Sequence, residues 1–308
     1  MNQRPAAYDF VRYLTAKRTV DDRALNPHVW AAMAAAAADR ARHVQPLQVL
    51  EIGAGVGTMI ERAAAWSLCP GAAVNYLAID AEPANIAAAQ ARLEAAQARL
   101  EAAQARLEAL PPAWSVQVEQ ADLFDFVRRP AALHRYDLLI ANAFLDLVDI
   151  PQTLPLLRRL LQPGGLFYFS ITFDGATILQ PEIDPAFDAQ VEAVYHRTMD
   201  ERITAGQRSG DSRSGRHLFG HLVRAGFDLR AAGASDWVVH PIAGHYPADE
   251  AYFLHFIVHT MQGALQSRAE LDPGQLTEWV ETRHRQVEQG ELVYIAHQLD
   301  VFGVCPAA

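Results

Sequence analysis

Short apolar runs alternate with segments of helical character through the middle of the chain. The apolar runs predict strands at 48–52, 74–79, 116–118, 136–141 and 166–171. The segments between them predict helices at 58–67, 83–110, 124–133 and 153–161. Near-continuous apolar strands separated by helices are typical of a parallel sheet that is covered on both faces. The pattern therefore predicts a doubly wound α/β fold, in which ligands bind beyond the carboxyl ends of the strands.

The regions that flank this core predict further elements. Residues 6–43 and 247–289 have helical character, while residues 174–214 are rich in turn formers and charges. A helix is expected at 216–225 and a strand at 229–239. We divide the chain into an N-terminal helical lid (1–45), a Rossmann-like core (46–246, with 174–214 partly lid or insertion), a helical cap insertion (247–290) and a final core strand (291–308).

Composition narrows the classes of function. Hydrophobic residues make up 51% of the 308 residues, which is enough for a sizeable core. The formal net charge of −10, without a dense basic run, disfavours nucleic acid as a partner. No apolar run is long enough for a bilayer span or a signal peptide, so we expect a cytoplasmic protein without membrane contact. Two cysteines provide neither a disulfide framework nor a zinc cluster, and we expect no metal site.

One helix carries a true repeat. The heptad AAQARLE occurs three times in tandem at 88–108, which places Leu93, Leu100 and Leu107 seven residues apart. Its residues are strong helix formers, so the helix predicted at 83–110 is about 28 residues or ~42 Å long. Two interpretations stay open: a coiled-coil arm for a homodimer, and a duplication that only lengthens a surface helix.

The first strand leads into the most informative loop of the sequence, G-A-G-V-G-T at 53–58. Glycines at a strand-to-helix turn let the backbone approach a ligand closely. Dinucleotide binding favours G-x-G-x-x-G, but the third glycine position is Thr58 here. Glu51, two residues before Gly53, would repel a pyrophosphate and attract a ligand that carries an ammonium and a sulfonium. The loop therefore fits a cationic, amino-acid-bearing nucleoside better than a nicotinamide dinucleotide.

This loop resembles motif I of the class I S-adenosylmethionine-dependent methyltransferases, and further motifs follow in the order of that family. Asp80 ends the second strand where the family binds the ribose hydroxyls, and Gln120-Ala121-Asp122-Leu123 resembles the adenine-binding segment. The segments 136–145 and 161–166 resemble motif IV and the turn into strand five. The cofactor-binding residues that the resemblance implies are Glu51, Gly53, Ala54, Gly55, Asp80, Ala81, Asp122, Leu123, Asn142, Ala143 and Phe144.

The resemblance implies a seven-stranded, mostly parallel Rossmann-like sheet whose last strand is antiparallel, with helical cap insertions. It also implies an enzyme that transfers a methyl group from S-adenosylmethionine to a small-molecule substrate. We expect the acceptor to be a hydroxyl group. Motif IV lacks the Asn-Pro-Pro-Tyr and Pro-Cys patterns of the DNA-modifying types. Two alternatives remain: a non-catalytic or protein-directed binding platform on the same fold, and a nicotinamide-dependent oxidoreductase.

No catalytic residue is assigned from the sequence. A general base adds ~10²–10⁴-fold when the acceptor is a hydroxyl, and the histidines of the C-terminal half are candidates, with His245 first among them. The pairs His217/His221 and His255/His259 have the i, i+4 spacing of metal ligands, but neither pair has an evident third ligand. Core or surface roles are therefore favoured for both pairs.

Three cations stand out in the polar stretch at 13–23. As part of a lid, Lys17, Arg18 or Arg23 could reach the cofactor's carboxylate or an acidic substrate. The other interpretation of this stretch is a solvated linker between two helices.

Asp80→Ala is expected to weaken S-adenosylmethionine binding by about 1–3 kcal/mol, because polar groups of the ligand lose a buried partner. Isothermal titration of the variant and the wild type measures the difference. Equal affinities would mean that the ribose is held elsewhere.

Overall fold

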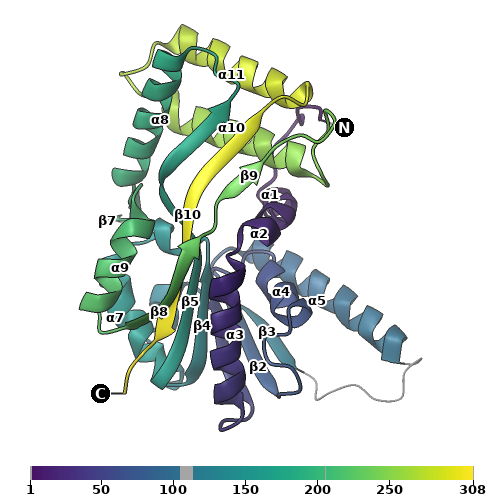
Figure 1. Ribbon diagram of the computed structural model, residues 1–308, viewed down its shortest axis with the longest axis vertical. Helices are drawn as coiled ribbons and strands as arrows, with labels where there is room; N and C mark the ends of the chain where they lie inside the picture. The colour runs from purple at the N-terminus through teal and green to yellow at the C-terminus, as the bar shows by residue number, and fades with distance from the viewer. Residues whose placement is uncertain (1, 105–113, 205, 308) are drawn as a thin grey trace.

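The computed structural model describes residues 2–104, 114–204 and 206–307, and its centre is an eight-stranded sheet (Figure 1). The strands are β1 (Leu47–Ile52), β2 (Val74–Asp80), β3 (Ser115–Gln120), β4 (Tyr136–Asn142), β5 (Leu161–Gln180), β8 (Asp228–Ala234), β9 (Trp237–Val239) and β10 (Val293–Val304). Their order is β3-β2-β1-β4-β5-β10-β8, and β9 pairs with β10 off this path. Strands β1 to β5 are parallel, and β10 runs antiparallel to its three neighbours. The predicted fold class, a doubly wound and mostly parallel sheet with an antiparallel last strand, is confirmed. The seven predicted strands correspond to the path from β3 to β8, and β9 is an additional strand.

Helices cover both faces of the sheet. They are α1 (Phe10–Ala16), α2 (Arg18–Ala24), α3 (Pro27–Ala41), α4 (Thr58–Ala65), α5 (Pro83–Gln104), α6 (Leu123–Phe126), α7 (Ile150–Leu160), α8 (Pro185–Asp200), α9 (Ser214–Arg224), α10 (Glu250–Leu265) and α11 (Pro273–Glu288). Short 3₁₀ turns are η1 (Pro130–Ala132) and η2 (Leu145–Leu147), and β6 (Ile203–Thr204) pairs with β7 (Gln207–Arg208). Residues of α3, α4 and α10 share one hydrophobic core, and residues of α6, α7 and α9 share the other.

Several helices begin with the same two-residue signal. Asn26-Pro27, Asp184-Pro185 and Asp272-Pro273 place an N-cap side chain before a proline at the first helical position. The cap side chain accepts hydrogen bonds from the free N–H groups of the first turn, and proline lacks the N–H that would be unpaired there. The bounds of α3, α8 and α11 therefore follow from local sequence.

Two predicted elements are divided in the structure, and a third is described only in part. The predicted helix at 124–133 is broken, because Pro130 cannot continue α6 and instead begins η1. The predicted strand at 229–239 divides into β8 and β9, where Asp236 accepts hydrogen bonds from Nδ1 of His297 (2.8 Å) and the backbone N–H of Gln298 (3.2 Å). The helix predicted at 83–110 is described as far as Gln104, and its remaining residues lie outside the described ranges.

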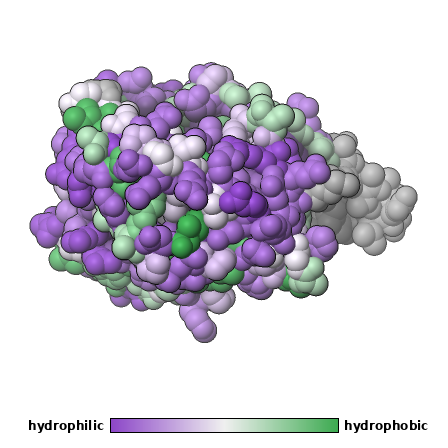
Figure 2. All heavy atoms as spheres, turned by 90° about the horizontal axis from the view of Figure 1, so that it is seen from above, coloured by the Kyte–Doolittle hydropathy of each residue, from purple (hydrophilic) through white to green (hydrophobic). Residues whose placement is uncertain are grey.

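The largest difference is the length of β5. The sequence predicts a strand at 166–171 followed by an irregular segment, whereas β5 continues to Gln180. Its outer half pairs with β10 up to Val293 opposite Gln180, so the partner that stabilises it lies more than one hundred residues away. In Figure 1 the outer parts of β5 and β10 rise above the core, and α8, α10 and α11 gather around them. The face seen from above is mostly hydrophilic, with small apolar patches (Figure 2).

Asp300 of β10 joins the N-terminal helices to the sheet. Its carboxylate accepts hydrogen bonds from the Tyr168 hydroxyl (3.0 Å), the Ile171 backbone N–H (2.9 Å) and the Asn26 backbone N–H (2.8 Å). Ile171 has a φ of +55°, a costly value for a β-branched residue. The Asp300 carboxylate therefore holds a strained strand residue and the start of α3 together.

Asp300→Ala is expected to lower the free energy of unfolding by at least about 2 kcal/mol, because three donors lose their acceptor inside the protein. Urea unfolding measures the change. Asp236→Ala, which removes a more exposed carboxylate between β8 and β9, the two strands that pair with β10, is the control and should cost less. Equal losses in the two variants would contradict a special role for Asp300.

Candidate active site

The strand order reverses at β1, which lies between β2 and β4. Ile52 is opposite Ile79 on one side and Ala141 on the other, so these three strands end at the same edge. Ligands of doubly wound sheets bind at such a reversal, beyond the carboxyl ends of the strands. The loops after β1, β2, β3 and β4 hold the residues that the sequence singled out.

The loop after β1 has the backbone shape that only glycine adopts easily. Gly53, Gly55 and Gly57 have φ values of +65°, +54° and +77°. The Ala54 N–H donates to the Ile79 carbonyl (3.0 Å), which fixes the loop against β2. A Cβ on Gly53 would collide with the ring of Phe144. The absence of a Cβ at Gly53 therefore gives room to the Phe144 ring, which lies directly against the loop.

Asp80 joins the first two loops. Its Oδ2 accepts from the Gly55 N–H (2.8 Å), and its Oδ1 accepts from the Glu82 N–H (2.9 Å) and the Asn85 Nδ2 (3.1 Å). A carboxylate has about four lone-pair sites, so Oδ2 keeps room for another donor. This arrangement fits a ribose hydroxyl.

Asp122 lies next to Asp80, because the Ala121 N–H donates to the Asp80 carbonyl (3.0 Å). Its Oδ1 caps α6 by accepting from the backbone N–H groups of Phe124 (2.8 Å) and Asp125 (3.3 Å). Within the described ranges, Oδ2 has no hydrogen-bond partner. The adjacent Leu123 is buried, while Ala81, on the neighbouring loop, is exposed. One free acceptor beside apolar side chains fits an adenine ring with its amino group.

The loop after β4 is strained and firmly held. Ala143 has a φ of +51°, and its N–H donates to the Ser170 carbonyl (2.8 Å). The Ser170 hydroxyl donates to Oδ1 of Asn142 (2.9 Å). A strained residue that its surroundings hold in place is typical of functional sites. This turn places the Phe144 ring on the glycine loop.

Glu51 lies beneath the loop instead of facing it. Its side chain is buried on the face that α4 covers, and the Tyr76 hydroxyl donates to its carboxyl group (2.8 Å). Burial raises the pKa of Glu51 to about 8, although Tyr76 and the charge of Arg62 act in the opposite direction. The group is therefore mainly neutral at pH 7 in this state. Its role as a cofactor contact stays a prediction.

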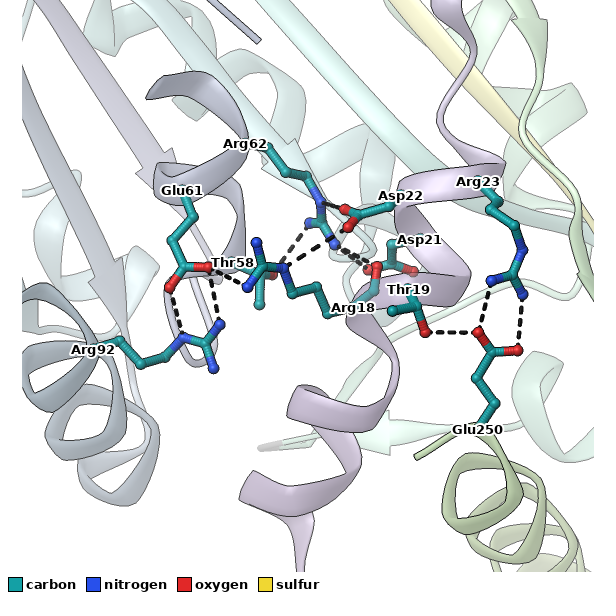
Figure 3. Close-up of polar contacts among 10 residues, drawn as sticks. All are labelled: Arg18, Thr19, Asp21, Asp22, Arg23, Thr58, Glu61, Arg62, Arg92 and Glu250. Atoms are coloured by element: carbon teal, nitrogen blue, oxygen red, sulfur yellow. Dashed lines mark hydrogen bonds and ion pairs between the residues drawn. The ribbon is translucent and has the colours of Figure 1, made fainter. Parts of the chain in front are cut away.

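Ion pairs hold the N-terminal helices against the helix that follows the glycine loop (Figure 3). Arg18 pairs with Glu61 (2.6 Å), which also pairs with Arg92 (3.0 Å). The buried Arg62 pairs with Asp22 (2.5 Å) and also bonds to Thr58 and to the Arg18 carbonyl. Sequence reasoning missed Arg62, although its place one turn after Thr58 on an otherwise apolar face was a signal.

The same helices contact the cap. Glu250 of α10 is fully buried and accepts hydrogen bonds from Arg23 (2.6 Å) and Thr19 (2.6 Å). Lys17 lies 3.3 Å from Asp21. The three cations considered from the sequence, Lys17, Arg18 and Arg23, are thus each paired with a carboxylate of the chain itself. The lid interpretation of this segment stays a prediction, and the three cations are occupied by carboxylates of the chain.

The histidines considered from the sequence lie at the surface or against other side chains. His245 is exposed on a tight turn. Nδ1 of His217 lies 2.5 Å from the Asp211 carboxylate. His255 is buried against His284, with 2.9 Å between their Nδ1 atoms, and His259 stacks on Tyr8. Among the described residues, no group of three or more His, Cys, Asp or Glu side chains could hold a metal ion.

Glu51→Gln is expected to stabilise the protein increasingly as the pH rises from about 4.5 to about 8. In this interval the Glu51 carboxyl group ionises in the unfolded wild type but stays protonated in the folded wild type. The wild type therefore loses stability as the pH rises, whereas the Glu51→Gln variant does not, because glutamine does not ionise. The difference should reach a few kcal/mol and level off above pH 8. Thermal unfolding of both proteins across this range measures it, and a difference independent of pH would contradict the raised pKa.

Comparison with known proteins gives one family match. Residues 50–167 match the model of a family described as a methyltransferase domain. No curated protein matches the sequence. The match confirms the predicted superfamily, with its enzyme class and its cofactor.

Solved structures with similar folds have low sequence identity. A putative methyltransferase from Bacillus halodurans is 14% identical, with 87% of this chain and 98% of that chain covered and a TM-score of 0.47. The YcgJ protein from Bacillus subtilis is 11% identical, with 92% and 100% covered and a TM-score of 0.47. A putative sarcosine dimethylglycine methyltransferase from Galdieria sulphuraria is 12% identical, with 99% and 94% covered and a TM-score of 0.43.

The sheet, the four loops at its edge and the family match agree with one another. Residues 50–167 of this chain match a methyltransferase domain, in agreement with the class I S-adenosylmethionine-dependent superfamily that the sequence predicts.

Proposed function

We propose that this chain transfers the methyl group of S-adenosylmethionine to a hydroxyl group of a small molecule. The observation that carries the proposal is the covered glycine loop. Leu14 of α1 lies 3.2 Å from the position of a Cβ on Gly55, and Phe144 lies against Gly53. An acceptor must fit beneath these side chains and the α1 helix, which favours a small molecule over a polymer.

The residues of the site would act mainly by positioning. The bound cofactor supplies a methyl group that its sulfonium already activates. Asp80 and Asp122 would fix the nucleoside, and the glycine loop would let it lie close to the backbone. The lid helices and the cap would exclude water and hold the acceptor in line. Proximity and orientation of this kind contribute up to ~7–11 kcal/mol in ideal cases.

The partners and the location belong to the same proposal. The net charge of −10 supports a protein that does not bind nucleic acid. No helix of the described residues is both long and apolar enough to cross a membrane. We propose a cytoplasmic enzyme. We also expect a homodimer that forms through the tandem heptads. Light scattering of a variant that lacks two heptads would test this expectation.

Isothermal titration with S-adenosylmethionine, S-adenosylhomocysteine and NAD(H) tests the cofactor. Micromolar binding of the two adenosyl ligands alone is expected. Gly55→Val should weaken it about tenfold or more, because the side chain fills the space beside Leu14. Gly263→Val is the matched control, since Gly263 is exposed on α10 with open space around its Cα, and it should bind normally.

Two further readouts complete the test. Circular dichroism checks that Gly55→Val folds, and Asp122→Asn replaces it if it does not. Transfer of a labelled methyl group to a panel of hydroxylated small molecules tests the reaction. Binding of NAD(H) alone would overturn the cofactor, while binding of both adenosyl ligands without any transfer would favour a binding platform.

A further inference from the structure

The chain begins with a strap, residues 2–9, that lies on the helices of the cap (Figure 1). Nη1 of Arg4 donates to both carboxylate oxygens of Glu281 in α11 (2.8 and 2.9 Å). The Tyr8 ring stacks on His259 of α10, with 4.0 Å between the two ring centroids. The strap is neither helix nor strand, so its position depends on these contacts with the cap.

The strap leads directly into α1, which covers the glycine loop. The Tyr252 hydroxyl of α10 accepts from the Asp9 N–H (2.6 Å) and donates to the Asp9 carbonyl (3.0 Å) at the end of the strap. The next residue begins α1, and Leu14 of this helix lies 3.2 Å from the position of a Cβ on Gly55. The contacts that hold the strap on the cap therefore also hold Leu14 over the loop.

Two buried histidines bind the beginning of the strap. His255 of α10 and His284 of α11 are 0% and 1% exposed, and their Nδ1 atoms are 2.9 Å apart. Nε2 of His255 lies 3.0 Å from the Asn2 carbonyl oxygen. A carbonyl oxygen only accepts hydrogen bonds, so Nε2 of His255 carries the hydrogen. One chain of hydrogen bonds thus runs from α11 through α10 to the strap.

This chain of hydrogen bonds fixes the protons of the pair. Because Nε2 of a neutral His255 is protonated, its Nδ1 has a free lone pair and accepts from the Nδ1–H of His284. Nε2 of His284 then carries no hydrogen, and this buried atom has no hydrogen-bond partner in the part of the chain that the structure describes. A further proton on Nδ1 of His255 would set two N–H groups against each other. A further proton on Nε2 of His284 would be a buried donor without an acceptor, which is costly.

The groups around the pair also oppose a positive charge. Burial lowers the pKa of His255, and it lowers the pKa of His284 to about 3. The charge of Arg4 on the strap lowers both pKa values further, and His259 of α10 has the same effect on His284. Glu288 of α11 acts in the opposite direction on His255, but it also accepts from the Arg4 N–H (3.3 Å). The pair is therefore neutral while the strap lies on the cap.

We propose that His255 and His284 form a proton-operated latch, which holds the strap on the cap when both rings are neutral and releases it when the pair is protonated. A protonated ring needs an acceptor that the closed arrangement does not provide, and water provides one only after the strap has left. Protonation of the pair and release of the strap therefore occur together. Release also frees α1 to move off the glycine loop, and only this effect on the cofactor rests on the proposed function.

The sign of the pH dependence follows from proton linkage. In the open state the histidines titrate near their ordinary pKa of about 6.5, whereas in the closed state the pKa of His284 is about 3. The latch is therefore closed above about pH 6.5. Below that value the ratio of closed to open strap falls by about tenfold per pH unit for each proton that opening takes up.

Hydrogen exchange of the strap tests the latch without any cofactor. In the closed strap the Arg4 N–H donates to Glu288 (3.3 Å). The Asp9 N–H donates to the Tyr252 hydroxyl (2.6 Å). The protection factors of these two amides, relative to an unstructured peptide of the same sequence, should be constant above about pH 6.5. They should fall by at least about tenfold per pH unit between about pH 6 and pH 5.

A pair that does not ionise removes the pH dependence. In the double variant His255→Gln/His284→Asn, the glutamine amide still donates to the Asn2 carbonyl and the asparagine amide replaces the Nδ1–H of His284. Protection of its strap should not fall between about pH 6.5 and pH 5. His259→Gln is the matched control, because His259 is exposed on the same helix and stacks on the same strap. This control should keep the pH dependence of the wild type.

Several outcomes would overturn the latch. One is wild-type protection that does not change with pH, and this measurement needs no variant. Another is a pH dependence that the double variant, shown to be folded by circular dichroism, keeps or that His259→Gln loses. Strap amides that are as protected as those of β1 at every pH would also overturn it, because the strap would then open only when the whole protein unfolds.

A second measurement connects the latch to the site. S-adenosylhomocysteine should dissociate faster from the wild type at about pH 5.5 than at about pH 7.5, whereas the double variant should release it at the same rate at both. Equal rates in the wild type would overturn the control of α1 by the latch. A chain that does not bind S-adenosylhomocysteine would overturn the proposed function, and exchange of the strap amides would still decide the latch.

Discussion

The arrangement of the N-terminal helices on the sheet depends most on the hydrogen bonds and ion pairs of the buried Arg62 guanidinium. Its donors reach Asp22 and the Arg18 carbonyl on the lid and Thr58 at the start of α4. Asp21 adds a second carboxylate at 3.5 Å. A buried charge is tolerated only when it is paired and its hydrogen bonds are satisfied, so the lid must lie where these acceptors meet Arg62. Since α4 begins where the glycine loop ends, the position of the lid and the shape of that loop are coupled.

Ion pairs extend this coupling to the cap. The α2 helix presents Arg62's partners on one side and Arg23, which binds Glu250 of α10, on the other (Figure 3). A short helix thus bridges the methyltransferase core and the insertion that would cover the acceptor. Many carboxylates of this acidic chain form ion pairs with arginines of other elements, and these pairs join the elements to one another.

The central strands and the cofactor loops could be predicted from the sequence because their signals are local. The runs at 48–52 and 74–79 match β1 and β2 to within one residue, since buried parallel strands are apolar throughout. The outer half of β5 could not be predicted, because its stability comes from β10. The protonation of Glu51 likewise follows from burial and not from its place in the motif.

The cap has a consequence for how this chain could diversify. Residues 240–292 leave the sheet after β9 and return at β10, and Tyr294 lies opposite Val239 in the β9–β10 ladder. The excursion therefore begins and ends at neighbouring points of one antiparallel pair, the geometry at which insertions are best tolerated. Lineages could lengthen, shorten or replace this excursion while the sheet and its nucleoside loops stay unchanged. Such an attachment lets acceptor preference evolve separately from the chemistry of methyl donation.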